Sequence, residues 1–328
     1  METICSIHIP GKMTIGLEFP LDNDWSLEGE KKRNLSGRPF GIPDISRHTE
    51  YIQLADQLGY ATLWMREVPV YDPAFGDGAQ LFDTIAYLGY IAGITKSITL
   101  GTAAIVFPLH DPLQLAKAVA SIENLSGSRF LFGVGLGDRP VEFPLFGYDF
   151  ETRAERFRHN HAIIEEAWKT QSGLSQYYEN LNNNIQVFPK PKNPIPWIIA
   201  GRAQQSMDWI AQNMQGWFNY PRPLAETANQ IIDWRNVLYD NNQASKPYIT
   251  AFHLNLLADD DAPFRPHRFG GAVGINGLLP LLKAYEEVGV NHMALHLRKS
   301  ETPVKEAIER IATTILPHFN YKEQDYAI

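Results

Sequence analysis

Two ionisable side chains directly follow an apolar run of the chain. A third stands just before the expected start of a helix. Arg66 and Glu67 come straight after the run at residues 61–65, and His110 stands just before a helix. A guanidinium, a carboxylate and an imidazole can orient a substrate and hold or move a proton. A solvated salt bridge between Arg66 and Glu67 is the structural alternative, as is a capping role for His110. We take Arg66, Glu67 and His110 as candidate catalytic residues.

The run IIAGRAQQSMDWIA, at residues 198–211, contains a second candidate site near its start. This site would bind an anion. The pattern predicts a strand, a tight turn at Ala200-Gly201 and a helix that begins near Gln204. Free backbone amides at a helix N-terminus, together with Arg202 and Ser206, suit a phosphate. A capped helix with a solvated arginine fits the same residues equally well.

Small residues collect where two adjacent strands are expected to leave the sheet. Residues 101–104 read GTAA, and Gly133, Gly135 and Gly137 follow in the next strand. Small side chains at two adjacent strand ends leave room for a planar ligand. Tight packing against a neighbouring strand or helix is the alternative at each single position.

Motifs for several other kinds of chemistry are absent from the sequence. Residues 133–137 read GVGLG, whereas the dinucleotide fingerprint needs G-x-G-x-x-G opening a helix directly. There is no H-E-x-x-H, C-x-x-C or G-x-S-x-G. His159 and His161 stand two apart on an expected helix, so they point to different faces. The sequence predicts neither a metal site nor a serine or cysteine nucleophile.

Eight short apolar stretches rich in β-branched or aromatic residues predict strands. They occupy residues 14–19, 61–65, 98–106, 129–134, 196–200, 216–220, 249–257 and 292–297. Segments with helical periodicity lie between them. Eight alternations of strand and helix favour a (β/α)8 TIM barrel of the α/β class.

The links from strand to helix are long in this scheme and would lie at the C-terminal rim, where barrel enzymes carry their active sites. Asp138, Arg139 and Glu142 form a charged cluster on one of these links. Residues 21–43 and 258–274 are candidate lids.

A small hairpin with an Asn-rich turn is expected at residues 177–191, before the fifth strand. We expect a single barrel domain over residues 1–328, with insertions in the rim loops.

Composition narrows the class of protein. The chain has 328 residues, a formal net charge of −8 and a single cysteine, Cys5. The acidic balance argues against a nucleic-acid partner. No apolar run is long enough to span a membrane, and the N-terminus does not read as a signal peptide. We expect a cytoplasmic protein without an intrachain disulfide.

The run ITLGTAAIVFPLHDPLQLAKAVASIENLSGSRFLFGVGLG, at residues 98–137, resembles the third and fourth βα units of the bacterial luciferase-like flavin monooxygenase family. PIPWIIAGRAQQSMDWIA, at residues 194–211, is similar to the phosphate-binding end of that family. The combination of REVP with GDRPVEFP resembles a subgroup of luciferase-type oxidoreductases.

The resemblance implies a barrel with FMN, or in some branches the deazaflavin F420, across its C-terminal mouth. It also implies a homodimer packed through the second and third barrel helices. The flavin ring would lie over Thr102, Ala103 and Gly135, and a cis peptide is expected near Ala103-Ala104. Phe19, at the end of the first strand, is a further candidate for cofactor contact.

Two departures from the family pattern change these expectations. Arg66 stands where luciferases carry a histidine, and Gly135 and Leu136 stand where they carry Cys-Arg. We therefore expect the phosphate to depend on the 200–206 segment. Its candidate cofactor-binding residues are Ala200, Gly201, Arg202, Gln205 and Ser206.

The leading hypothesis is a two-component monooxygenase that uses reduced FMN and O2 to oxidise a small organic substrate. The reduced FMN would come from a separate flavin reductase. An F420-dependent dehydrogenase or reductase that transfers hydride is the second hypothesis. A non-catalytic flavin-binding protein is the third.

Overall fold

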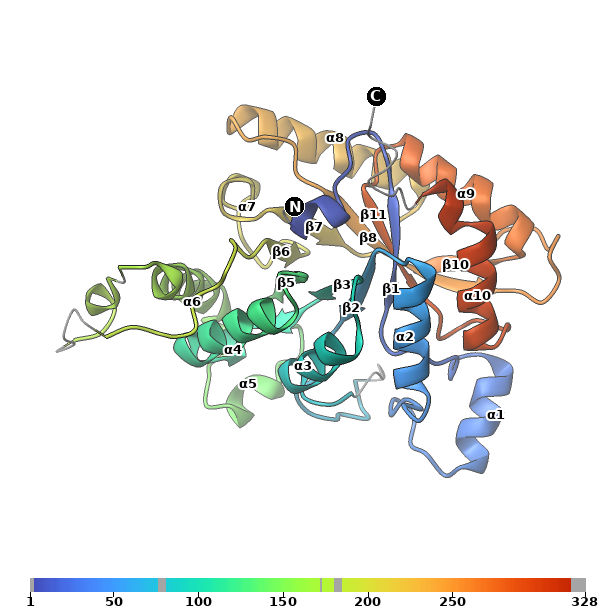
Figure 1. The fold of residues 1–328 in the computed structure, drawn as a ribbon, viewed down its shortest axis with the longest axis horizontal. Helices are drawn as coiled ribbons and strands as arrows, with labels where there is room; N and C mark the ends of the chain where they lie inside the picture. Colours follow the sequence, from blue (N-terminus) through green and yellow to red (C-terminus); the bar gives the residue numbers. More distant parts are fainter. Residues whose placement is uncertain (1–2, 76–80, 172, 180–184, 320–328) are drawn as a thin grey trace.

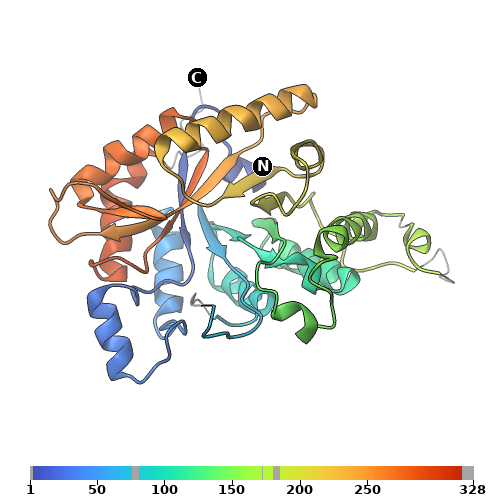
Figure 2. The same cartoon turned by 180° about the vertical axis from the view of Figure 1, so that it is seen from behind.

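The computed structural model describes residues 3–75, 81–171, 173–179 and 185–319. In this part of the chain, eight parallel strands close into a barrel, because β11 pairs with both β1 and β8 (Figures 1 and 2). The predicted TIM barrel is confirmed. The barrel strands are β1 Thr14–Glu18, β2 Thr62–Met65, β3 Thr99–Thr102, β5 Phe130–Gly135, β6 Trp197–Ala200, β7 Gly216–Asn219, β8 Tyr248–Leu256 and β11 His292–His296.

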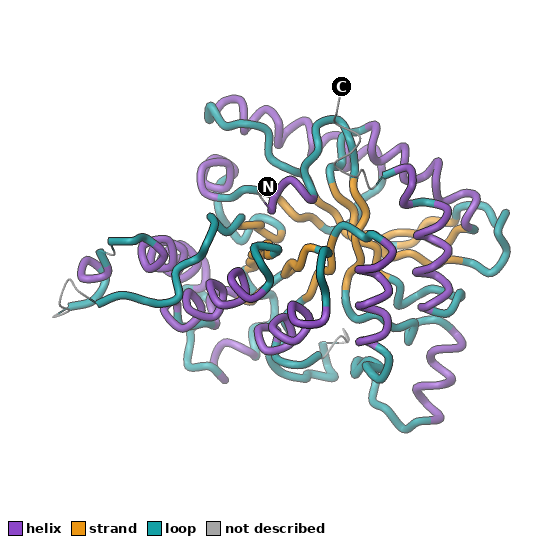
Figure 3. The backbone as a smooth tube through the Cα atoms, viewed as in Figure 1, coloured by secondary structure: helices purple, strands orange, loops and turns teal. Residues whose placement is uncertain are grey.

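Helices surround the barrel, with one in each link to the next strand and one after the last strand (Figure 3). They are α2 His48–Leu58, α3 Thr84–Ile94, α4 Pro112–Leu125, α6 Arg153–Trp168, α7 Met207–Asn213, α8 Leu224–Asp240, α9 Ile275–Glu287 and α10 Val304–Thr314. Two more helices lie in rim loops, α1 Leu27–Leu35 and α5 Glu142–Leu145. Short 3-10 turns are η1 Thr3–Ser6, η2 Phe107–Leu109, η3 Leu174–Gln176 and η4 Leu316–His318. No helix of the described chain has the length and apolarity to cross a membrane.

The start of α4 follows directly from its sequence. The Asp111 side chain accepts hydrogen bonds from the backbone amides of Leu113 and Gln114, and Pro112 is the first helical residue. Replacing Asp111 with alanine leaves these amides without their acceptor. We expect Asp111→Ala to lower the free energy of unfolding by about 1 kcal/mol, measured by urea denaturation. Asp111→Asn keeps an acceptor and is the control, and an equal loss in both variants would contradict the capping role.

The third strand ends at a bend toward the mouth of the barrel. The Ala103-Ala104 peptide bond is cis, as predicted. Beyond it the short strand β4 Ile105–Val106 continues beside β5. Residues 103–106 thereby lie along the rim of the barrel.

Two expectations about inserted segments differ from the structure. Residues 180–184 of the expected hairpin lie outside the described residues, while residues 177–179 and 185–191 contain no strand. Pro189 and Pro191 lack the backbone amide that a strand of such a hairpin requires for its ladder.

A different segment forms the hairpin, within the candidate lid at residues 258–274. It consists of β9 Arg265–His267 and β10 Gly270–Val273, and β10 pairs in parallel with the second half of β8. β8 extends beyond its pairing with β11, so its free edge is covered by this hairpin.

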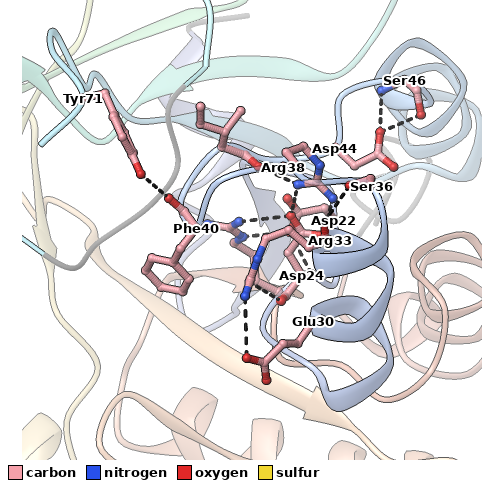
Figure 4. A network of polar contacts seen from close by, with 12 residues as sticks. Asp22, Asp24, Glu30, Arg33, Ser36, Arg38, Phe40, Asp44, Ser46 and Tyr71 are labelled. Atoms are coloured by element: carbon pink, nitrogen blue, oxygen red, sulfur yellow. Dashed lines mark hydrogen bonds and ion pairs between the residues drawn. The ribbon is translucent and has the colours of Figure 1, made fainter. Parts of the chain in front are cut away.

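The other candidate lid, residues 21–43, is fastened to the barrel by buried ion pairs. Arg298, which follows β11, donates from Nε to Asp22 at 2.7 Å, and one of its terminal nitrogens lies 3.7 Å from Asp24. Arg38 pairs with Asp24, and Arg33 donates to the Asp24 carbonyl oxygen at 3.3 Å (Figure 4).

Candidate active site

A pocket of about 560 Å³ opens at the carboxyl ends of the barrel strands. Its volume lies in the range of about 300–1,000 Å³ that is usual for small-molecule sites. The lining residues are Glu18, residues 66–68, 103–106 and 135–139, Glu142, Phe150, Arg153, residues 200–204 and 218–220, Ala251 and His253.

Most of the predicted site residues line this pocket. From the candidate catalytic set, Arg66 and Glu67 do so, and His110 contacts Glu67. The cofactor candidates that line it are Ala103, Gly135, Leu136, Ala200, Gly201 and Arg202. Predicted residues at the ends of four different strands, β2, β3, β5 and β6, are thus brought together at one mouth.

The structure places Thr102 and Phe19 outside the pocket lining. Thr102 is fully buried, and its hydroxyl bonds to the backbone carbonyl and amide of Gly133 at 2.7 and 2.8 Å. Phe19 is also fully buried and packs against the rings of His48 and Tyr87. Both side chains therefore fill protein interior.

Gln205 and Ser206 have structural partners as well. Gln205 is buried, donates to the carbonyl oxygens of Ala154 and Ala203, and accepts from Arg158. Ser206 accepts from the Trp209 amide at 3.2 Å and is the N-cap of α7, which begins at Met207 and not near Gln204. The turn before that helix faces the pocket, and the helix itself is seven residues long.

The strand-end glycines have two different roles. A Cβ at Gly101 would lie 2.5 Å from the Trp64 ring, and one at Gly133 would lie 1.5 Å from the Thr102 carbonyl oxygen. These two glycines are required by packing. Gly135, with Ala103 and Ala104, lies on the pocket wall.

Glu67 is the centre of a hydrogen-bonded cluster at the rim. Its carboxylate accepts from the Val106 amide at 2.6 Å, and His110 Nε2 lies 3.0 Å from both of its oxygens. The Glu67 amide also donates to the Ala104 carbonyl oxygen at 3.2 Å. Glu67 therefore holds residues 104–110 against the end of β2.

The cluster changes the titration of His110. Burial lowers the pKa of the imidazole, but the hydrogen bond and charge of Glu67, with a smaller effect of Asp83, raise it above its ordinary value overall. His110 is therefore protonated to a higher pH than a free histidine, and its ion pair with Glu67 weakens as the pH rises through that raised pKa.

Neutralising Glu67 tests this assignment. In Glu67→Gln the charge is lost while an amide oxygen can still accept from Val106, so the pKa of His110 should fall by about one unit or more. The measurement is an NMR titration of the His110 ring protons. Asp83→Asn, which keeps a helix-capping side chain at the start of α3, should lower the pKa less. An unchanged pKa in Glu67→Gln would contradict the pairing.

Arg66 lies beside a carboxyl group that our sequence reasoning missed. Its Nε is 3.9 Å from Glu18 Oε1, and Glu18 is only 4% exposed. Burial raises the pKa of Glu18 to about 6, and the Arg66 charge lowers it only in part. Glu18 is the last residue of β1, so the strand-end rule that selected Arg66 could have found it.

His253, Asn219 and Arg153 are further pocket residues that our sequence reasoning missed. The His253 ring stacks on His296 with centroids 4.3 Å apart. Burial, with a smaller effect of the Arg66 charge, lowers the pKa of His253 to about 3, and burial also holds the pKa of His296 well below its ordinary value. These two imidazoles are neutral near pH 7 and therefore add no charge to the pocket.

The predicted charged cluster on the loop after β5 faces the same pocket. Asp138, Arg139 and Glu142 all line it, and Arg139 lies 3.8 Å from Glu142. The Arg139 guanidinium also lies over the Phe75 ring, 4.4 Å from its centroid. Arg139 thus joins the loop after β5 to the loop after β2.

One end of the pocket is suited to an anion. The turn after β6 has left-handed backbone at Gly201, Ala203 and Gln204, with φ values of 62°, 46° and 56°. A non-glycine residue in this region is uncommon and often marks a functional segment. Arg202 is exposed on this turn. Arg153 lines the same pocket, and its buried Nε has no hydrogen-bond partner among the described residues.

Sequence relatives include two kinds of oxidoreductase. An F420-dependent glucose-6-phosphate dehydrogenase of Amycolatopsis mediterranei is 26% identical over 171 residues, which is 50% of this chain and 49% of that protein. The alkanal monooxygenase alpha chain of Photorhabdus luminescens is 26% identical over 170 residues, which is 49% of this chain and 44% of that protein. The aligned region thus spans about half the length of these relatives.

Solved structures share the fold along nearly the whole chain. The monooxygenase RslO1 of Streptomyces bottropensis superposes with a TM-score of 0.73 at 16% identity, covering 93% of this chain and 99% of that one. The oxygenating constituent of 3,6-diketocamphane monooxygenase from Pseudomonas putida, in complex with FMN, gives a TM-score of 0.69 at 12% identity, covering 94% and 99%.

The family profile described as luciferase-like monooxygenase matches residues 21–310. This range includes most of the barrel and nearly all of the pocket lining. The chain belongs to the luciferase-like monooxygenase family of oxidoreductases.

Proposed function

We propose that this chain is a two-component monooxygenase that uses reduced FMN and O2 to oxidise a small organic substrate. One observation carries the proposal: a single pocket at the barrel mouth joins an arginine-bearing turn to a wall of small residues. A phosphorylated, planar cofactor has these two chemical parts.

The residues present fit FMN. A phosphate would meet Arg202 and Arg153, and the Arg153 Nε is a buried donor that has no partner among the described residues. A flat ring needs a wall without large side chains, and Ala103, Ala104 and Gly135 supply one. The pocket volume of about 560 Å³ leaves room for a ring and a small second molecule.

The chain's own groups would then act by binding, orientation and local charge. FMN in its reduced form supplies the electrons that activate O2. Arg202 and Arg153 would hold the phosphate, and Arg66 would place a positive charge beside Glu18 on the pocket wall. Glu67 and His110 fix the 104–110 segment and share a proton between imidazole and carboxylate. The rim loops exclude water from the reacting centre.

F420-dependent hydride transfer is the second candidate. Arg139 adds a fourth guanidinium to the pocket, beside Arg66, Arg153 and Arg202, and the acidic tail of F420 would be stabilised by it. A relative named as an F420-dependent glucose-6-phosphate dehydrogenase also supports F420 as the cofactor. A flavin-binding protein without turnover is a third candidate, because Arg66, Gly135 and Leu136 replace the family residues named above.

We also propose the partners that the resemblance implies. The chain would receive reduced FMN from a separate flavin reductase in the cytoplasm and would form a homodimer through α3 and α4. We propose neither a nucleic-acid partner nor a membrane partner.

Ligand titration tests the proposed function. Purified protein is titrated with oxidised FMN, with photoreduced FMN under argon and with F420. Arg202→Ala should weaken FMN binding about 10- to 100-fold, because a charge-assisted hydrogen bond is worth about 1.5–3 kcal/mol. Arg222→Ala, outside the pocket, should leave FMN affinity unchanged.

The cofactors separate the three candidates. Preference for reduced FMN, with oxidation of an added organic substrate, supports the monooxygenase. Tighter binding of F420 favours hydride transfer. Tight binding of oxidised FMN with no turnover favours the non-catalytic protein, and a failure to bind all three would refute a flavin site.

A further inference from the structure

Glu18 is a buried carboxyl group on the pocket wall with one oxygen unused. It is 4% exposed, and its Oε2 is buried without a hydrogen-bond partner among the described residues. Its other oxygen lies 3.9 Å from Arg66 Nε, which is an ion-pair distance but too long for a hydrogen bond. A buried acceptor without a hydrogen-bond partner destabilises the protein, and more so if the group is charged.

A structural carboxylate in the same pocket has a different environment. Both oxygens of Glu67 accept hydrogen bonds, from Val106 and His110. Glu67 thereby positions the rim, whereas Glu18 Oε2 has no comparable partner in the described chain. A bound molecule would supply the missing donor.

Asn219 provides a second unused polar group on the same pocket. It ends β7, is 7% exposed, and its buried Nδ2 has no hydrogen-bond partner among the described residues. One pocket therefore offers an acceptor from β1 and a donor from β7. A ligand that carries both a donor and an acceptor would satisfy the two groups together.

The charges around Glu18 determine which form of the carboxyl is present. Arg66, which follows β2, faces it with a guanidinium, while His296 on β11 and His253 on β8 are neutral near pH 7. Burial places the pKa of Glu18 at about 6. The carboxylate is the main form at pH 7.5, and the neutral acid is the main form at pH 5.

We propose that Glu18 accepts a hydrogen bond from an N–H or O–H group of the molecule bound in this pocket, while the Asn219 amide, from β7, donates to an acceptor elsewhere in the same pocket. The inference rests on the proposed function, which places a flavin and a substrate here. The ligand group that meets Glu18 is an uncharged N–H or O–H donor. It belongs either to the imide edge of the flavin ring or to a hydroxyl-bearing substrate.

The first arm of the test compares FMN with FMN methylated at the imide nitrogen, which lacks that N–H. The dissociation constants are measured at pH 5 and pH 7.5 for wild type, Glu18→Gln and the surface control Asp233→Asn. If the flavin is the source, Glu18→Gln weakens FMN binding at pH 7.5 about tenfold and removes its pH dependence through pH 6. The methylated flavin then binds wild type and Glu18→Gln alike.

The second arm uses 2-hydroxycyclohexanone and cyclohexanone as probes, with and without FMN. If the substrate is the source, FMN affinity is unchanged in Glu18→Gln. Wild type then binds the hydroxyketone several-fold more tightly than the ketone, and Glu18→Gln does not. This arm can be measured without flavin. A failure of FMN to bind would therefore refute the proposed function, while the hydroxyketone would still test the role of Glu18.

A direct measurement covers the case in which Glu18→Gln does not fold. The carboxyl carbon of Glu18 is followed by NMR in wild-type protein labelled with 13C-glutamate, assigned by comparison with Glu18→Asp. A ligand that donates to Glu18 should lower its pKa by about one unit, because a hydrogen bond to the charged form favours that form. No discrimination in either arm, with an unmoved Glu18 resonance, would overturn the proposal.

Discussion

Arg298→Met should lower the free energy of unfolding by about 3–5 kcal/mol, because it leaves a buried carboxylate without its counter-charge. Arg298 is fully buried, donates to Asp22 at 2.7 Å and lies against the Trp25 ring. Burial already raises the pKa of Asp22 to about 6, with the Arg298 charge opposing that rise. Without Arg298 that pKa should rise further, so the loss of stability should be larger at pH 8 than at pH 5.

Urea denaturation at the two pH values measures this effect. Arg47→Met is the matched control, because Arg47 is half-exposed and pairs with Glu50 on the surface. We expect that control to leave the free energy of unfolding nearly unchanged, because an exposed ion pair adds little stability. Asp22→Asn combined with Arg298→Met should be less destabilised than Arg298→Met alone. An equal effect of Arg298→Met and Arg47→Met would show that the buried pair does not anchor residues 21–43.

The barrel could be predicted because its signals are local. Each expected strand overlaps a barrel strand within a few residues, since a short run of β-branched and aromatic residues marks a strand buried on both faces. Two helix ends likewise depend on local residues, because the Asp111 side chain caps the start of α4 and Gly59 ends α2 in a left-handed backbone conformation. These signals need no knowledge of distant contacts.

The hairpin of β9 and β10 could not be predicted in the same way. It exists because β8 extends beyond β11 and leaves an edge that β10 covers. That edge depends on the register of strands more than 30 residues apart in sequence. The run at 177–191 carries a stronger local signal for a hairpin, but Pro189 and Pro191 remove amides that its second strand would need.

The candidate site was predicted in outline by one rule, that residues at the C-terminal ends of barrel strands meet. Arg66, Glu67, Ala103, Gly135 and Arg202 followed from that rule or from the family resemblance. The direction of each side chain did not follow. Thr102 points toward Gly133, and Phe19 packs on α2 and α3, because side chains along a strand alternate between its two faces.

Glu18 shows the converse error. It was included in an apolar run at residues 14–19 and assigned to the strand, so its charge was not considered. A carboxyl group within a buried strand is itself a signal, because it is stable there only with a partner or a function. Here the partner within the chain is incomplete.

Gly133→Ala should destabilise the protein more than any other glycine-to-alanine substitution at the barrel mouth. A Cβ at this position would lie 1.5 Å from the Thr102 carbonyl oxygen and 2.6 Å from its carbonyl carbon. Backbone atoms of β3 cannot move away without breaking the pairing of β3 with β5. We expect a loss of about 3 kcal/mol or more in the free energy of unfolding, or no folded protein.

Gly89→Ala is the control for this variant. Gly89 lies within α3, and a Cβ there would meet Ile122 at an ordinary distance of 3.7 Å. Alanine in a helix is favoured over glycine, so the control should be neutral or gain about 0.5–1 kcal/mol. If Gly133→Ala were as harmless as Gly89→Ala, the close approach of the Thr102 backbone would not explain why position 133 carries glycine. Contact of Gly133 with a ligand would then be the remaining explanation. The two outcomes therefore decide whether the small residues of β3 and β5 serve the barrel or the pocket, a question that the sequence leaves open at each position.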